Sequence, residues 1–332
     1  MSGRRKDRIS QLPIEILDNI MGLLPIQEAA RTAILSTIWR DCWSNLTQLK
    51  FDLQFCSYVW RKYFDSYNNT STCMYIINKV LMQHNGPIRK FVFDFKFEPD
   101  ISISNAPNSR KFDFDQWFLF ITRKGVEEMD ITFPTTTIAT YEINKYFRLP
   151  DCIFSCLTLK RLHLSGVLVA PTINAPCIFP NVTSLSFDEV VFGTINLDCV
   201  IDVPMLEILS FSYCENASYF NIKAPRLDRL TLNDYEIEDD IEFDARISDS
   251  ILWDGLQSVA KVLTMFNTFK LRLFNGWRSE LQFIKMLLAH FSALEKVVII
   301  RRADLDSHDQ FEVMQKLLHF LRASKKAKII YI

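Results

Sequence analysis

The feature that most constrains the fold of this chain is a short apolar pattern that recurs along most of its length. Each copy has an apolar residue, two variable positions, a second apolar residue, one variable position and a third apolar residue. Because alternate side chains of a strand share a face, each copy predicts a short strand with its apolar side chains inward. The copies are Ile88, Phe91, Phe93; Val126, Met129, Ile131; Leu159, Leu162, Leu164; Val182, Leu185, Phe187; Leu206, Leu209, Phe211; Leu227, Leu230, Leu232; and Leu294, Val297, Ile299.

The spacing of these copies indicates that they stack. Units that begin at Leu159, Val182, Leu206 and Leu227 are 23, 24 and 21 residues apart, which is within the range of leucine-rich repeats. A single unit cannot bury its own apolar face, so neighbouring units must stack into a solenoid. The alternative is a generic mixed α/β domain, because isolated copies also occur by chance in strand-rich proteins. A run near residues 266 to 273 fits the pattern in two registers.

The N-terminal stretch is apolar on more sides than a small module can bury. Pro13 suits the start of a helix, and Pro25 ends it. A second helix is expected from about Gln27 to Leu35, and a third turn carries Trp39 and Trp43 on one face. The first helix has one apolar stripe of Ile16, Leu17, Ile20 and Leu24 and a second of Ile14 and Met21. Since so short a segment buries little surface, part of it is expected to dock on another protein.

These residues resemble the F-box proteins. The match follows the family's order and spacing through Leu12-Pro13-Ile14-Glu15-Ile16-Leu17, Leu24-Pro25, Glu28-Ala29-Ala30-Arg31-Thr32, Leu35-Ser36 and Trp39-Arg40. The resemblance implies that this module binds a Skp-type adaptor, which links it to a cullin scaffold. Two departures stand out: Ile26 replaces the usual Thr or Ser as a poor N-cap of the second helix, and Thr37 and Ile38 replace two basic residues.

Adaptor binding is expected to rest on the large apolar residues of this module, because such groups dominate protein interfaces. The alternative is that some of them only form the module's own core. The predicted adaptor-binding residues are Leu12, Pro13, Ile16, Leu17, Ile20, Leu24, Leu35 and Trp39.

Three further segments have a recognisable character. Residues 52 to 86 are expected to be helical, with Met74, Ile77, Val80 and Leu81 on one stripe. Insertions between the repeats hold a candidate helix over Phe112 to Thr122 and an acidic run over Tyr235 to Asp249.

The C-terminal segment, Leu294 to Ile299 followed by Phe320 to Ile329, resembles the FBD region that closes many plant F-box, leucine-rich repeat proteins. A helix from about Gln310 to Arg322 and a strand from Lys328 are expected there. An exposed solenoid end must be covered, and this helix is expected to cover it with Phe311, Met314, Leu317, Leu318 and Leu321.

Composition restricts the function classes. The formal net charge of -1 and the pI near 6.5 provide no general field for phosphates, so no nucleic-acid partner is expected. The sequence contains no apolar run of membrane-spanning length and no signal-peptide core, so no membrane partner and a cytoplasmic or nuclear location are expected. The eight cysteines show no zinc-finger spacing and are expected to be reduced thiols, with no metal site.

No enzymatic motif accompanies the repeats. The sequence lacks GxxxxGK[ST], GxGxxG, GxSxG and HExxH, and its five histidines have no neighbour at ligand or triad spacing. Neither catalytic residues nor cofactors are expected. Binding is therefore the expected role.

The solenoid predicts where a target binds. Residues between the apolar anchors point to the opposite, concave side of each strand, where they align across repeats. This face includes Glu128, Asp130, Thr132, Ser165, Ser184, Asp188 and Ile208, and the predicted target-binding residues on it are Arg161, His163, Ser186, Ser210, Ser212, Arg229, Thr231 and Asn233. The alternative is a face that is merely hydrated, with target recognition by loops at the rim.

The expected fold is α/β, with a helical F-box module, a leucine-rich repeat solenoid and an α/β cap. The expected domains are a flexible N-terminus over 1–8, the F-box over 9–50, a helical linker or N-terminal cap over 51–87, repeats over 88–290 and an FBD-like cap over 291–332. The expected function is a non-catalytic substrate-recognition subunit of an SCF-type (Skp-cullin-F-box) ubiquitin ligase, which binds an unidentified target. The competing class is a repeat scaffold or small-ligand sensor that binds the adaptor without ubiquitylating a target.

Overall fold

The computed structural model describes residues 9–63, 69–95, 108–134, 146–170, 178–193, 201–215, 222–233, 267–274, 276, 278–301 and 307–332. The chain divides into two compact units, Met1–Lys145 and Tyr146–Ile332, here called unit 1 and unit 2. The acidic run over 235–249 and the N-terminal residues 1–8 lie outside the described residues.

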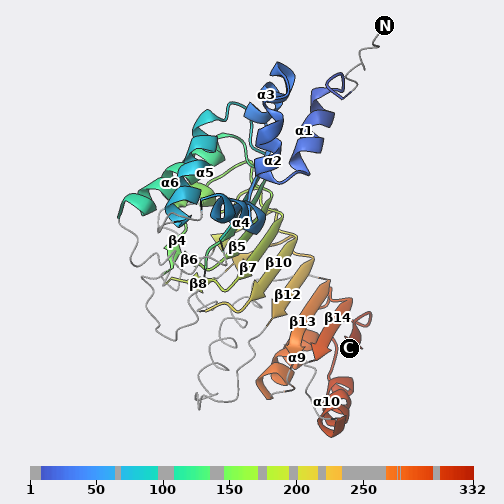
Figure 1. Ribbon diagram of the computed structural model, residues 1–332. Coiled ribbons are helices and arrows are strands. Elements are labelled where there is room, and N and C mark those ends of the chain that lie inside the picture. The colour runs from blue at the N-terminus through green and yellow to red at the C-terminus, as the bar shows by residue number, and fades with distance from the viewer. Residues whose placement is uncertain are drawn as a thin grey trace. The chain divides into compact units, whose positions relative to one another are not determined.

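Unit 1 starts with three short helices that pack on one another, and strands and helices then alternate (Figure 1). Its elements are α1 (Ile14–Gly22), α2 (Ile26–Thr32), α3 (Thr37–Ser44), β1 (Gln48–Phe51), α4 (Leu53–Lys62), α5 (Asn69–Gln83), β2 (Lys90–Asp94), α6 (Asn108–Arg123) and β3 (Glu128–Thr132). The second helix starts one residue earlier and ends three residues earlier than expected. Pro25 is its N-cap, so the prediction of Ile26 as a poor cap is wrong; Ile26 is instead a buried first residue of the helix.

Strand β1 was not expected from the sequence. Leu46, Leu49 and Phe51 follow the repeat pattern and are fully or almost fully buried. The strand pairs in parallel with β2, and β2 pairs in parallel with β3. The repeats therefore begin inside the stretch that reads as F-box, where the F-box match obscured the pattern.

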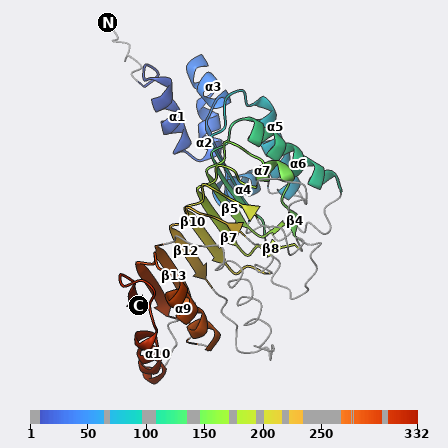
Figure 2. The ribbon, with the colours of Figure 1, turned by 180° about the vertical axis from the view of Figure 1, so that it is seen from behind.

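Helices α4, α5 and α6 cover the apolar side of these strands, and α5 and α6 lie side by side (Figure 2). The ring of Phe118 on α6 meets Phe91 of β2 edge to face, with centroids 6.4 Å apart. The expected helix over 112–122 is confirmed and is longer. The expected stripe on α5 is shifted, because Cys73, Ile77 and Leu81 are buried at four-residue spacing whereas Met74 and Val80 are only half-buried.

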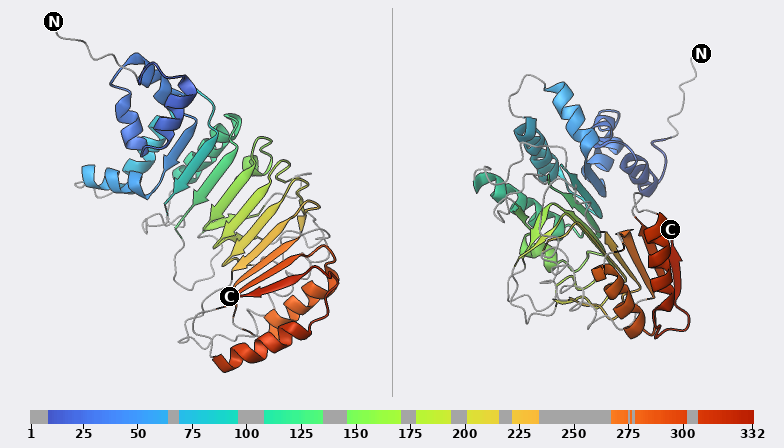
Figure 3. Two further views of the ribbon diagram at one scale, coloured as in Figure 1. Left: turned by 90° about the vertical axis from the view of Figure 1, so that its right-hand side faces the viewer. Right: turned by 90° about the horizontal axis from the view of Figure 1, so that it is seen from below.

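Unit 2 is built from parallel strands that lie side by side in the order β5-β7-β10-β12-β13-β14-β15 (Figure 3). The main elements are β5 (Arg161–Ser165), β7 (Ser184–Asp188), β10 (Ile208–Ser212), β12 (Arg229–Asn233), β13 (Thr268–Phe274), α9 (Arg278–His290), β14 (Lys296–Arg301), α10 (Ser307–His319) and β15 (Lys328–Tyr331). Short elements connect them: β4 (Phe147–Arg148), α7 (Asp151–Phe154), β6 (Val167–Val169), β8 (Val191–Phe192), β9 (Ile201–Asp202) and β11 (Ile222–Lys223).

The predicted repeat strands are confirmed. Every apolar anchor of the seven predicted copies is buried, and anchors of adjacent strands pair directly, as Leu185 does with Leu209 and Leu209 with Leu230. Strand pairing also decides the register of the run near residues 266 to 273, because Phe269 pairs with the anchors Leu230 and Val297. Parallel pairing in register stacks identical positions of successive repeats, and this produces a continuous core within each unit.

The helix and the strand that were expected in the C-terminal segment are present as α10 and β15, but the helix faces a different way from the prediction. Helix α10 buries Val313 and Leu317, whereas Phe311, Met314 and Leu318 are exposed. The helix ends at His319, so Leu321 lies beyond it and is 82% exposed. Helix α9, which was not expected, covers much of the anchor side here with Ile284, Leu287 and Leu288, all buried.

Candidate adaptor-docking and target-binding surfaces

Helices α1 to α3 expose more apolar surface than the sequence suggested. Of the predicted adaptor-binding residues, Leu12, Pro13, Ile16, Ile20, Leu24 and Leu35 are exposed, whereas Leu17 and Trp39 are buried in the module. Four further exposed residues were missed, namely Ile14, Leu23, Ile34 and Ile38. Leu23 and Ile34 are the most exposed of these, at 85% and 84%. Soluble proteins rarely gather so many bare aliphatic side chains unless a partner covers them.

Buried and capping contacts hold these helices in place. The Ser36 hydroxyl caps α3 by accepting from the Trp39 amide. The Trp39 indole N–H in turn donates to the Ser10 hydroxyl over 3.0 Å. Trp39 therefore supports the exposed patch from beneath, which is the alternative role stated for some of the predicted residues.

Polar contacts fasten the helical module to β1. One Asp18 oxygen accepts from the Thr47 amide at 2.9 Å and the other from the Thr47 hydroxyl at 2.5 Å. The Lys50 ammonium donates to the Gly22 carbonyl at 2.9 Å, where it caps the negative end of α1. Charged hydrogen bonds of this kind are stronger than neutral ones. The module and the first repeat strand therefore form one piece.

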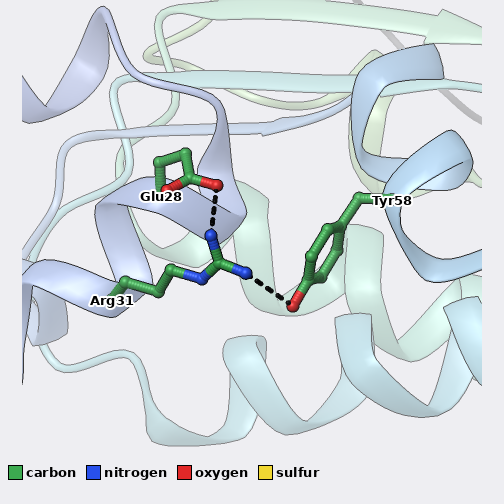
Figure 4. Close-up of polar contacts among 3 residues, drawn as sticks. All are labelled: Glu28, Arg31 and Tyr58. Carbon is green, nitrogen blue, oxygen red and sulfur yellow. Dashed lines mark hydrogen bonds and ion pairs between the residues drawn. The ribbon is translucent and has the colours of Figure 1, made fainter. Parts of the chain in front are cut away.

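Arg31 joins α2 to α4 (Figure 4). Its guanidinium donates to a Glu28 carboxylate oxygen at 2.7 Å and to the Tyr58 hydroxyl at 3.4 Å. The Lys62 ammonium lies 5.5 Å from the centre of the Tyr58 ring. Hydrogen bonding to Lys62, and then to Arg31, lowers the pKa of Tyr58, although burial opposes the shift. Because Arg31 is fully exposed, this cluster orients α2 rather than contributing much stability.

His84 anchors the end of α5 to the segment before β1. Its ring Nε2 lies 2.9 Å from the buried Leu46 carbonyl. Burial lowers the pKa of His84, and the positive charge of Lys124 adds to this shift, whereas the hydrogen bond to Leu46 opposes it. The side chain is therefore a structural, neutral imidazole.

The predicted target-binding residues lie together on the strands of unit 2, on the side opposite the buried anchors. Strand pairing aligns them in three rows, here called the outer rows. The first row is Arg161, Ser184, Ile208, Arg229 and Thr268; the second is His163, Ser186, Ser210, Thr231 and Lys270; the third is Ser165, Asp188, Ser212, Asn233 and Arg272. The expectation that Arg161 and Arg229 occupy equivalent positions is confirmed.

Hydrogen bonds run along these rows. The Ser210 hydroxyl donates to the Ser186 hydroxyl at 2.8 Å, and the Asn233 amide donates to the Ser212 hydroxyl at 2.6 Å. Ser165 is buried, and so is Thr132 at the end of β3. The prediction that these two side chains belong to the exposed concave face is therefore wrong. The side chains of Arg161 and Arg229 are the most exposed of the predicted target-binding set. They are the residues best placed to meet a partner.

Within the described residues, no three His, Cys, Asp or Glu side chains gather as a metal site. In the same part of the chain, no helix combines the length and apolar character needed to cross a bilayer.

Comparison with known families agrees with this architecture. Residues 9–50 match the model of the F-box domain, which covers α1 to α3 and the start of β1. Residues 114–275 match the model described as FBD-associated F-box protein At5g56370, LRR repeats. Neither model is that of a catalytic family.

Several proteins of Arabidopsis thaliana are similar to this chain. F-box/FBD/LRR-repeat protein At1g13570 is 32% identical over 235 residues, which are 70% of this chain and 50% of that protein. F-box/LRR-repeat protein At3g59200 is 29% identical over 72% of this chain and 44% of its own length, and FBD-associated F-box protein At4g10400 is 25% identical over 68% and 51%. The chain thus spans about half the length of these curated relatives. With its F-box helices mounted on parallel repeat strands, the chain belongs to the family of F-box proteins with FBD-associated leucine-rich repeats.

Proposed function

We propose that this chain is the substrate-recognition subunit of an SCF-type ubiquitin ligase, with a Skp-type adaptor on α1 to α3 and a target protein on the outer rows. The observation that carries the proposal is the set of exposed aliphatic side chains on the F-box module, Leu23 and Ile34 above all. An adaptor that covers them would remove a large apolar area from water, which is the main driving force for association.

The mechanism is positional. A subunit that holds both the adaptor and a target raises the effective concentration of the target's lysines near a conjugating enzyme that other subunits carry. Effective concentration depends on the stiffness of the connection between the two binding sites. The contacts of Asp18 and Lys50 support this role, because they join the F-box helices to the first repeat strand without a flexible linker.

The adaptor contact is tested with two aspartate substitutions of equally exposed leucines. Leu35 on the F-box module and Leu318 on α10 are both 67% exposed. Leu35→Asp is expected to reduce co-purification of a Skp-type adaptor by about tenfold or more, whereas Leu318→Asp leaves it unchanged. Both variants should melt like the wild type, because exposed substitutions rarely change stability by much.

The outcomes separate the possible roles. Equal adaptor capture by both variants would refute the assignment of α1 to α3 as the docking site. Adaptor capture without any adaptor-dependent target turnover would favour the scaffold or sensor role. Target turnover is measured as the half-life of proteins that proximity labelling identifies while the proteasome is blocked.

We also propose that the complex acts in the cytoplasm or the nucleus. The described cysteines, Cys42, Cys56, Cys73, Cys152, Cys156 and Cys214, are all free thiols. Free thiols are typical of reducing compartments. Imaging of a fluorescent fusion tests this, and accumulation in a secretory compartment would contradict it.

A further inference from the structure

The outer rows change character along unit 2. Strands β5 to β10 present mostly hydroxyl groups there, and the Ser210 hydroxyl donates to that of Ser186. From β12 onward the same face carries five cations, Arg229, Lys270, Arg272, Lys296 and Lys328. No acidic residue occupies an outer position on β12 to β15. We call this part of the face the basic face.

The basic face also offers an aliphatic side chain, that of Ile330. Val298 pairs with Lys270 on β13 and with Ile330 on β15, so it lies in the second row, but it is buried, at 9% exposure. Ile330 is 37% exposed. The described outer positions of β12 to β15 include no aromatic residue.

The charges of the basic face are largely uncompensated. Arg229 forms an ion pair with Asp228 at 3.3 Å, at the rim of the strand. Within the described part of the chain, Lys270, Arg272, Lys296 and Lys328 form no ion pair. Neighbouring strands lie about 4.8 Å apart, so these cations repel one another until an anion binds.

The opposite side of these strands is already covered. Phe269, an anchor of β13, packs edge to face on Phe283 of α9, with ring centroids 5.6 Å apart. Phe269 and Phe283 are both buried. The outer positions are therefore the side of β13 that a partner can reach.

We propose that the basic face binds an acidic peptide segment with interspersed aliphatic residues. The charge of the cations favours an anionic partner, and the exposed Ile330 beside them favours one with apolar side chains. A nucleic acid is disfavoured, because surfaces that hold single strands stack the bases on aromatic side chains. This inference deepens the proposed function, and it rests on that function only in treating the segment as part of the target.

The test uses the full chain and a fluorescein-labelled, glutamate-rich peptide with interspersed leucines. The test variant combines Lys270→Glu, Lys296→Glu and Lys328→Glu. The control variant combines Lys79→Glu, Arg123→Glu and Lys325→Glu, which change the net charge equally at exposed positions off this face. Fluorescence anisotropy gives Kd at two salt concentrations, because exposed charge interactions weaken as salt screens them.

The test variant is expected to raise Kd by about tenfold or more, which corresponds to about 1.4 kcal/mol, while the control stays near the wild type. Glutamine at the same three positions should give a smaller change in the same direction. Equal losses in test and control, no binding by the wild type, or tighter binding of a single-stranded oligonucleotide than of the peptide would each overturn the proposal. Adaptor co-purification, measured on the same samples, reports separately on the F-box function.

Discussion

Two adjacent leucines of α10 provide a direct test of how the C-terminal cap is held. Leu317 is 2% exposed and Leu318 is 67% exposed, although both looked buried from the sequence. Leu317→Ala should lower the free energy of unfolding by about 2 to 5 kcal/mol, because it removes buried methyl groups and leaves a cavity. Leu318→Ala should change it by no more than about 0.5 kcal/mol.

The measurement is urea unfolding followed by circular dichroism, with the same baseline and slope analysis for both variants. The residue type, the substitution and the helix are identical, so propensity cancels and only burial differs. Adaptor capture should be unchanged in both variants, because the F-box module folds in unit 1. Similar losses from the two substitutions would show that the exposed stripe of α10 is packed and that the orientation described above is wrong.

Two further perturbations probe unit 1. Since burial lowers the pKa of His84, the unfolded chain binds a proton on this side chain more readily than the folded chain does. The free energy of unfolding should therefore fall as the pH drops from the ordinary imidazole pKa of about 6.5 towards the lower pKa of the folded state. Urea titrations of His84→Gln should lack this dependence on pH. Asp18→Ala should cost about 1 to 3 kcal/mol because the amide and the hydroxyl of the half-buried Thr47 both lose their acceptor. The exposed neighbour Asn19→Ala should cost little in the same thermal melts, and equal losses from the two would contradict the role of Asp18.

Sequence reasoning succeeded where structure depends on a local period. The anchors of each repeat follow one short pattern, and parallel pairing then leaves each of them only one face to occupy. Thus Leu185 and Leu209 were placed correctly, and the register of Arg161 with Arg229 followed from theirs. The first two F-box helices were recognisable for a different reason, because Pro13 and Pro25 stand at their starts.

The orientation of a helix with two apolar stripes could not be predicted. On α10, Phe311, Met314 and Leu318 have the helical spacing expected of a buried face, but they are exposed. Val313 and Leu317, which are four residues apart, form the face that is buried. The same ambiguity affected α1, where Leu17 and Met21 are buried and Ile16 and Ile20 are not. Only the position of the neighbouring elements decides between such stripes. Sequence periodicity carries no information about that position.

Strand β1 fixes the small F-box module to the neighbouring strand β2. Its residues end the F-box match and also begin the repeat sheet, since Leu49 pairs with Phe91 of β2. Its Lys50 and the preceding Thr47 hold α1, and the Leu46 carbonyl holds His84, which directly follows α5. Any rotation of the F-box helices relative to β2 would therefore have to break several buried or charged hydrogen bonds at once. This coupling ties the direction in which an adaptor is presented to strands β1 and β2 of unit 1. It is also why Asp18→Ala should alter stability even though Asp18 lies outside the exposed aliphatic patch.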